Sequence, residues 1–155
     1  LACVALPAAV LLAAQWGAFA GSPPPDLGVQ GGRLRVPSPT PNSVHSQAAR
    51  WPGHPQQAYA QIDPLPLQGD GPATMARLRA LVAAMPGATV VTARDDYLHA
   101  SFRSRWMGFV DDAEFWLDPA AGVVQLRSAS RLGRRDFGVN RARVEAIRAA
   151  LAAAP

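Results

Sequence analysis

Apolar and polar residues alternate along four consecutive stretches in the second half of the chain. These stretches are residues 88–94, 96–102, 108–117 and 123–130. A period of two is typical of a β-strand that buries one of its faces. Asp95-Asp96 supplies a short turn after the first stretch, and DPAAGV supplies the last turn. The pattern therefore predicts a four-stranded antiparallel meander.

An apolar sheet face results when neighbouring strands are aligned with apolar residues opposite one another. In this alignment the RSRWMG turn places Asp112 opposite His99, and the last turn places Glu114 opposite Arg127. The predicted apolar face consists of Val91, Leu98, Ala100, Phe102, Phe109, Phe115, Leu117, Val124 and Leu126. The other face is polar.

Two further segments carry apolar residues at the spacing of an α-helix. The first is residues 72–85, with Pro72 in a favourable first position. The second begins at Asn140, a residue type favoured at the N-cap, and reads NRARVEAIRAALAAA. Their inward positions are Met75, Leu78, Val82 and Met85 in the first helix and Val144, Ile147 and Leu151 in the second. We expect an α+β fold with both helices packed on the apolar face of the sheet.

The N-terminal part of the chain has a different composition. Residues 1–20 carry no charge and end in an A-x-A pattern, which predicts a signal peptide or a membrane anchor and leaves both alternatives open. Residues 21–55 are rich in Pro and Gly and are predicted to form a linker and an extended arm. A single α+β domain would occupy residues 56–155, with an extended stretch at 58–67 whose prolines restrict it to a sheet edge.

The chain is basic, but its charge pattern does not favour nucleic acid as a partner. Its net charge is +4, its sequence pI is about 10.5, and all fifteen basic residues are Arg. A bias toward Arg also follows from a GC-rich genome. The Arg residues alternate with Asp and Glu, which favours local ion pairs over a continuous phosphate-binding track.

The polar sheet face is the candidate functional surface, and two interpretations of it are open. His99, Asp112 and Glu114 could supply an acid and a base or hold a divalent metal in a hydrolase. The simpler alternative is structural, with Glu114 paired to Arg127 and Asp112 accepting a hydrogen bond from His99. A single His in the cluster weakens a zinc site, so we predict no metal and no other cofactor.

The same face could instead bind a small anionic ligand, a lipid headgroup or an envelope protein. The residues predicted to do so are Arg94, Tyr97, Arg127 and Arg131. Three further polar residues are predicted to be structural. Asp111 falls on the apolar face and needs a partner, for which Arg131 or the backbone at the start of the second helix is expected. Asp136 is expected to fix the strand-to-helix turn, and Asn140 to cap the helix.

Several ordered motifs give the chain a family resemblance. Tyr97-Leu98-His99-Ala100, FVDDAEF, RSASR and the GRRDFGVNRARVEAIR segment resemble the bacterial domain of unknown function 1499 family, over about residues 34–151. A PN-x-V-x-S-Q core at residues 41–47 belongs to the same resemblance. Positions near that core which usually hold cysteine in the family are Val36 and Ser43 here, so no disulfide is implied in the arm.

The resemblance implies an exported or membrane-associated bacterial protein and brings no established activity. We therefore expect a cell-envelope protein, either periplasmic or anchored in the inner membrane. Its expected role is that of a non-catalytic binding or envelope module that uses the polar sheet face. The alternative is a hydrolase or metal-dependent enzyme that uses His99, Asp112 and Glu114.

Overall fold

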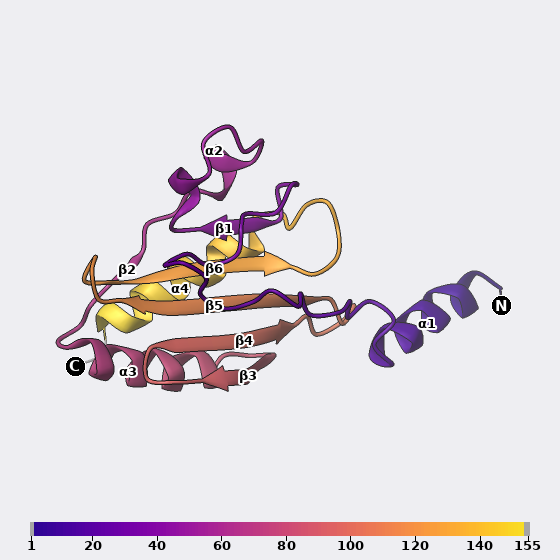
Figure 1. Ribbon diagram of the computed structural model, residues 1–155. Helices are drawn as coiled ribbons and strands as arrows, with labels where there is room; N and C mark the ends of the chain where they lie inside the picture. Colours follow the sequence, from indigo (N-terminus) through magenta and orange to yellow (C-terminus); the bar gives the residue numbers. More distant parts are fainter. Residues whose placement is uncertain (1, 154–155) are drawn as a thin grey trace.

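The protein is an α+β structure built on one antiparallel sheet. The computed structural model describes residues 2–153, with side chains from residue 9 onward (Figure 1). The sheet has six strands rather than the four predicted, in the order β1-β6-β5-β4-β3, and β2 also pairs with β6. The strands are β1 (Ser43–His45), β2 (Leu65–Pro66), β3 (Ala88–Ala93), β4 (Tyr97–Arg103), β5 (Val110–Asp118) and β6 (Val123–Ser130). The two additional strands come from the Pro-rich part of the chain.

Four α-helices accompany the sheet, two more than predicted. They are α1 (Ala2–Gln15), α2 (Gln57–Ala60), α3 (Gly71–Ala83) and α4 (Val139–Ala153), and a 3-10 helix spans Ala48–Arg50. α3 and α4 pack on the same face of the sheet, whereas α1 projects from one end of it (Figure 1). No helix in residues 2–153 has both the length and the apolar character needed to cross a membrane.

The pairing of β5 with β6 confirms the predicted register, with Glu114 opposite Arg127. The predicted register of β4 with β5 is wrong by two residues, because His99 lies opposite Glu114 and not Asp112. Ser104 closes the intervening turn by bonding to Phe109, and Gly108 adopts a φ of +64° there. An error of two residues leaves every side chain on its predicted face.

Two residues of the predicted apolar face lie outside the core. Val91 is 55 % exposed because a β-bulge between Val90 and Thr92 inserts it as an extra residue, so Val90 takes the place opposite Ala100. Phe109 is exposed because it lies in the turn before β5 instead of in the ladder. Both errors arise where the backbone departs from a regular strand.

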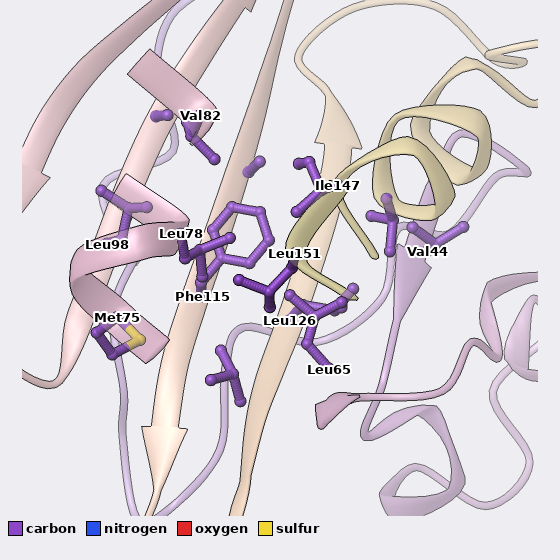
Figure 2. Close-up of a cluster of buried hydrophobic side chains, with 14 of the residues drawn as sticks. Val44, Leu65, Met75, Leu78, Val82, Leu98, Phe115, Leu126, Ile147 and Leu151 are labelled. Atoms are coloured by element: carbon purple, nitrogen blue, oxygen red, sulfur yellow. The ribbon is translucent and has the colours of Figure 1, made fainter. Parts of the chain in front are cut away.

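The core fills the space between the sheet and the helices α3 and α4 (Figure 2). Asp70 caps α3 by accepting a 2.7 Å hydrogen bond from the N–H of Ala73. The predicted helical stripes are confirmed, with Met85 only partly buried. The fully or nearly buried side chains include Val44, Leu65, Met75, Leu78, Val82, Leu98, Phe115, Leu126, Val144, Ile147 and Leu151.

Asn140 does not cap α4, contrary to the prediction. The helix begins at Val139, so Asn140 lies inside its first turn and is completely buried. Asp136 takes the capping role, because its carboxylate accepts hydrogen bonds from the N–H groups of Gly138 and Asn140. These bonds are consistent with the expectation that Asp136 fixes the strand-to-helix turn.

Candidate functional site

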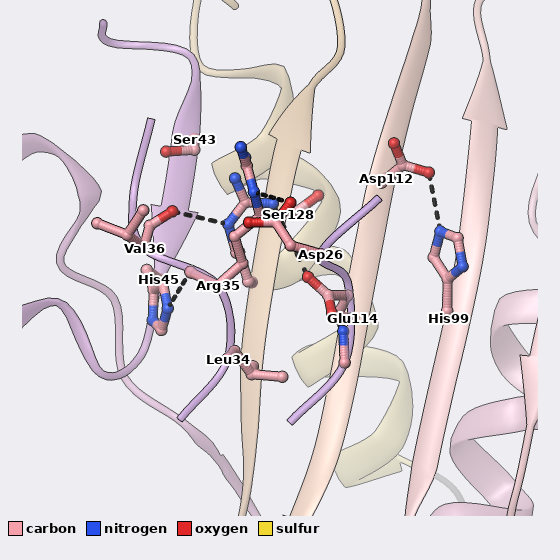
Figure 3. A network of polar contacts seen from close by, with 12 residues as sticks. Asp26, Leu34, Arg35, Val36, Ser43, His45, His99, Asp112, Glu114 and Ser128 are labelled. Atoms are coloured by element: carbon pink, nitrogen blue, oxygen red, sulfur yellow. Dashed lines mark hydrogen bonds and ion pairs between the residues drawn. The ribbon is translucent and has the colours of Figure 1, made fainter. Parts of the chain in front are cut away.

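The polar sheet face is buried and does not form the open surface that was predicted. Asp112, Glu114 and Arg127 are each 1 % exposed or less, and His99 and Tyr97 are also buried. Residues 21–42, here called the covering segment, run across this side of the sheet (Figures 1 and 3). The face is therefore an internal layer between the sheet and the chain's own N-terminal part.

Backbone groups of the covering segment bond directly to the buried charges. The N–H of Gly28 donates a 2.7 Å hydrogen bond to Oε1 of Glu114. Arg127 Nε donates to the carbonyl of Val36 at 3.3 Å. These bonds compensate part of the cost of desolvating the charges. Oε2 of Glu114 and Nη1 of Arg127 are buried without a hydrogen-bond partner among the described residues.

The two contacts expected of the structural interpretation are present in the polar face. His99 Nε2 lies 2.8 Å from Oδ1 of Asp112, and Arg127 Nη1 lies 3.8 Å from Oε2 of Glu114. Tyr97 donates its hydroxyl to Oε1 of Glu114 at 2.8 Å. Burial and the neighbouring Glu114 carboxylate both raise the pKa of Tyr97.

Asp112 is the most strongly held carboxylate of the face. Arg131 binds it through two hydrogen bonds, Nε to Oδ2 at 2.7 Å and Nη2 to Oδ1 at 2.9 Å. Burial alone would raise the pKa of Asp112, but the bonds from Arg131 and His99 outweigh burial and lower it to about 2. The same contact raises the pKa of Arg131. Asp112 is thus a fixed anion and a poor proton carrier near neutral pH.

Asp111 has a different partner from the one predicted. It faces the helices, as expected, but Nη2 of Arg143 on α4 lies 2.5 Å from its Oδ2, while Arg131 is occupied by Asp112. Arg143 also donates to Oγ of Ser128 and to Oδ1 of Asn140. The interpretation of Asp111 as structural agrees with this network.

The four residues predicted to bind a ligand do not share one accessible surface. Arg127 is buried and Arg131 is bonded to Asp112. Arg94 stands apart in the exposed β3–β4 turn, with its guanidinium 4.7 Å from the centre of the Tyr97 ring. Residues 9–153 contain no group of three or more His, Cys, Asp and Glu side chains arranged to hold a metal ion.

A pocket of about 890 Å³ lies on the helix side of the sheet, at the end from which α1 emerges. Its floor is the row Phe102, Asp111 and Ser130, together with Arg143 of α4. Its walls come from the segment after α3 and from two loops, residues 104–109 and 131–138, and they include Met85, Pro86, Gly87, Arg105, Phe109, Leu132, Arg135 and Phe137. The size is within the usual range of ligand pockets, about 300–1,000 Å³.

The pocket could not be predicted from the sequence, because its walls come from three segments far apart in the chain. One signal was available, since Leu132 and Phe137 are apolar residues in a Gly-containing loop outside any periodic segment. Apolar residues in such loops have no core to enter unless a partner or ligand covers them.

Comparisons with known proteins identify the family. Residues 33–151, most of the chain, match the model of the family described as "Protein of unknown function (DUF1499)". The chain therefore belongs to this family, as its motifs predicted. Searches of curated proteins and of solved structures found no match.

Proposed function

We propose that this protein is a non-catalytic binding module that works at a membrane surface of the bacterial cell envelope. One observation carries the proposal, namely the distribution of exposed large apolar side chains. Within residues 9–153, the exposed large apolar side chains gather in two places, with Val36 and Val91 as the exceptions. One group lies in α1 and at Trp16 just after it, and the other lies in the two loops that wall the pocket and at the first residue of α4. The residues are Val10, Leu11, Leu12, Trp16, Trp106, Phe109, Leu132, Phe137 and Val139.

Direct contacts hold α1 against this end of the domain. Arg103 donates to the carbonyls of Ala14 and Gln15 at 3.0 and 3.1 Å. The rings of Phe19 and Phe109 lie 5.5 Å apart. The apolar helix and the apolar loops thus form one continuous end of the molecule.

The charge at this end suits an anionic membrane. The two loops and the strand end before the first of them contribute four Arg residues that form no ion pair with a described residue, namely Arg103, Arg105, Arg134 and Arg135. Asp136, the acidic residue in the same stretch, is buried and hydrogen-bonded. Exposed aromatic side chains next to Arg are typical of surfaces that lie in the interfacial layer of a bilayer.

The alternative, a hydrolase or metal-dependent enzyme, gains no support from the arrangement of its candidate residues. His99, Asp112 and Glu114 bond to neighbouring side chains beneath the covering segment. A substrate would have to displace that segment to reach them.

Flotation with vesicles tests the membrane proposal. The full chain should bind vesicles rich in anionic lipid, and a Trp16→Ser, Trp106→Ser double variant should bind at least five-fold more weakly. Val91→Ser is the matched control because Val91 is an exposed apolar residue on β3, outside the apolar end. A wild-type chain that stays unbound, or a double variant that binds like the control, would overturn the proposal.

A further inference from the structure

The pocket between the two apolar loops has the features of a site for an amphiphile. It lies beyond the end of α3 at Ala83, where the chain turns into β3 through Gly87. Arg143 of α4 lies over its floor, with its guanidinium 4.4 Å from the centre of the Phe102 ring. The exposed surface of the pocket is mostly apolar, and the exposed side chains of Phe109 and Leu132 contribute to it. A mainly apolar cavity of this size suits an extended hydrocarbon chain.

The charged groups of the pocket leave a positive excess. Four Arg and two Asp line it. Asp111 is neutralised by Arg143, and Asp136 accepts hydrogen bonds from Tyr59 and from two backbone N–H groups. Arg105 and Arg135, both exposed, make no ion pair with any described residue. These two guanidinium groups are free to bind an anion.

Phe137 provides an independent observation. It is the most exposed large apolar side chain described, at 92 %, and it lines the pocket. Its φ of +52° lies in the left-handed region, which costs a non-glycine residue about 1 kcal/mol or more. Asp136 holds the segment in place through its bond to the N–H of Gly138. A strained backbone that presents an aromatic ring to solvent at a pocket's edge is typical of a ligand clamp.

The location of the pocket limits which ligands reach it. Gly21, which follows α1, lies against Leu132 at the pocket wall, where a Cβ on Gly21 would be 3.0 Å from Cγ of Leu132. If α1 and its aromatic neighbours lie in a membrane, the pocket is adjacent to lipid. This step rests on the proposed function.

We propose that the pocket binds a single-chain anionic amphiphile, a fatty acid or a lysophospholipid, with its acyl chain against Phe109 and Leu132 and its head group at Arg105 and Arg135. Phe137 closes over the chain. A carboxylate head group and a phosphate head group would both bind as anions to the two Arg residues. The experiment below distinguishes a fatty acid from a lysophospholipid.

Binding is measured with the full chain by calorimetry, using probes below their critical micelle concentrations. Laurate and lauroyl lysophosphatidic acid have the same chain and different anionic heads, and lauryl maltoside has the same chain with an uncharged head. One saturable site is expected for at least one anionic probe, and the tighter of the two identifies the head group. Binding of the maltoside should be at least ten-fold weaker.

Variants test the assigned residues. An Arg105→Ala, Arg135→Ala double variant should raise the Kd of the anionic probe at least ten-fold and leave maltoside binding unchanged, whereas Arg94→Ala, an exposed Arg elsewhere, should change neither. Leu132→Trp should block all probes by filling the pocket, and Phe137→Ala, at an exposed position that does not support the core, should weaken all of them about five-fold.

Three results would overturn the proposal: no saturable binding of either anion, maltoside binding as tight as that of the anions, or an unchanged Kd in both the double Arg variant and Phe137→Ala. A wild-type dimer that Leu132→Trp dissociates would show that a second copy of the chain occupies the pocket instead. Trp16→Ser alone separates this proposal from the preceding one, because Trp16 does not line the pocket, whereas Trp106 lies beside Arg105, whose guanidinium is 5.0 Å from the centre of its ring. If the wild-type chain does not bind vesicles but binds laurate, the membrane proposal fails and the pocket assignment stands.

Discussion

The backbone N–H of Gly28 donates a 2.7 Å hydrogen bond to the carboxylate of Glu114, a residue 86 positions further along the chain. This bond joins the covering segment to the middle of the sheet. Glu114 also accepts the Tyr97 hydroxyl, and its Oε2 faces Arg127 at 3.8 Å. The polar layer is therefore held by charges that depend on one another for compensation.

Glu114→Ala should destabilise the protein by about 3 kcal/mol or more, because it leaves the completely buried Arg127 without its counter-charge. Glu114→Gln should cost less, because its amide oxygen still accepts from Gly28 and Tyr97. Urea denaturation measures both. Glu145→Ala is the control, since Glu145 forms an exposed ion pair with Arg148 that is worth roughly 0.5 kcal/mol. Equal losses for Glu114→Ala and Glu145→Ala would contradict the buried-charge account.

His45 should make the protein less stable as the pH falls from about 6.5 toward 3. Its Nδ1 accepts from the N–H of Gln47 and its Nε2 lies 3.0 Å from the carbonyl of Arg35, so the neutral ring satisfies both contacts. Burial, and next the charge of Arg127, lower the pKa of His45 to about 3 from the ordinary 6.5. Only the unfolded chain takes up a proton between these values, so the contribution of His45 is complete above 6.5 and is lost below it.

His45→Gln should flatten the dependence of unfolding free energy on pH between 6.5 and 4. The control is His54→Gln, because His54 is partly exposed and should leave the slope of the wild type. An unaltered slope in His45→Gln would show that His45 does not stay neutral in the folded protein.

Asp112 should affect the stability of the folded protein at lower pH than His45 does. Its pKa falls from 3.8 to about 2 on folding, so its stabilising effect is complete above about pH 4 and is lost as the pH falls through 2. The shift corresponds to about 2 kcal/mol. Asp112→Asn should lower stability by that order at pH 7 and reduce the loss between pH 4 and 2, measured by urea denaturation. Asp63→Asn is the control, because Asp63 is exposed, and it should lose as much stability between pH 4 and 2 as the wild type. A greater loss of stability over this range in Asp112→Asn would contradict the role given to Asp112.

Gly87→Ala should destabilise the fold through a backbone clash. Gly87 has a φ of +73°, and a Cβ there would collide with the carbonyl oxygen of Arg103. Gly122→Ala shares the left-handed φ, at +65°, but meets no atom within 4 Å. The difference between the two variants isolates the clash and should be about 2 kcal/mol by thermal or urea unfolding. Equal losses of stability in the two variants would show that the positive φ, and not the clash, causes the loss.

The strands β3 to β6 and the helices α3 and α4 could be predicted because their signals are local. Periods of two and 3.6 persist over whole elements, and a register error of two residues at β4–β5 did not move any side chain to the other face. Asp95 and Asp96 mark the β3–β4 turn in both sequence and structure. The displacement of Val91 could not be predicted from a period of two, because a bulge inserts one residue and shifts the alternation at that point.

The polar row could also be predicted, and so could the pairing of Glu114 with Arg127, since both follow from strand register. The burial of the polar row could not be predicted, because the covering segment lacks any periodic pattern. The position of the covering segment depends on single backbone hydrogen bonds such as the one from Gly28 to Glu114.

The sequence by itself determined the strands β3 to β6, the helices α3 and α4, the faces of the sheet and the family, because each is recorded in residues close together in the chain. Only the tertiary structure decided which surfaces are accessible. It placed residues 21–42 over the polar face and brought three distant segments together around the open pocket. Accessibility depends on what packs against a residue, and the spacing of neighbouring residues does not record such long-range contacts.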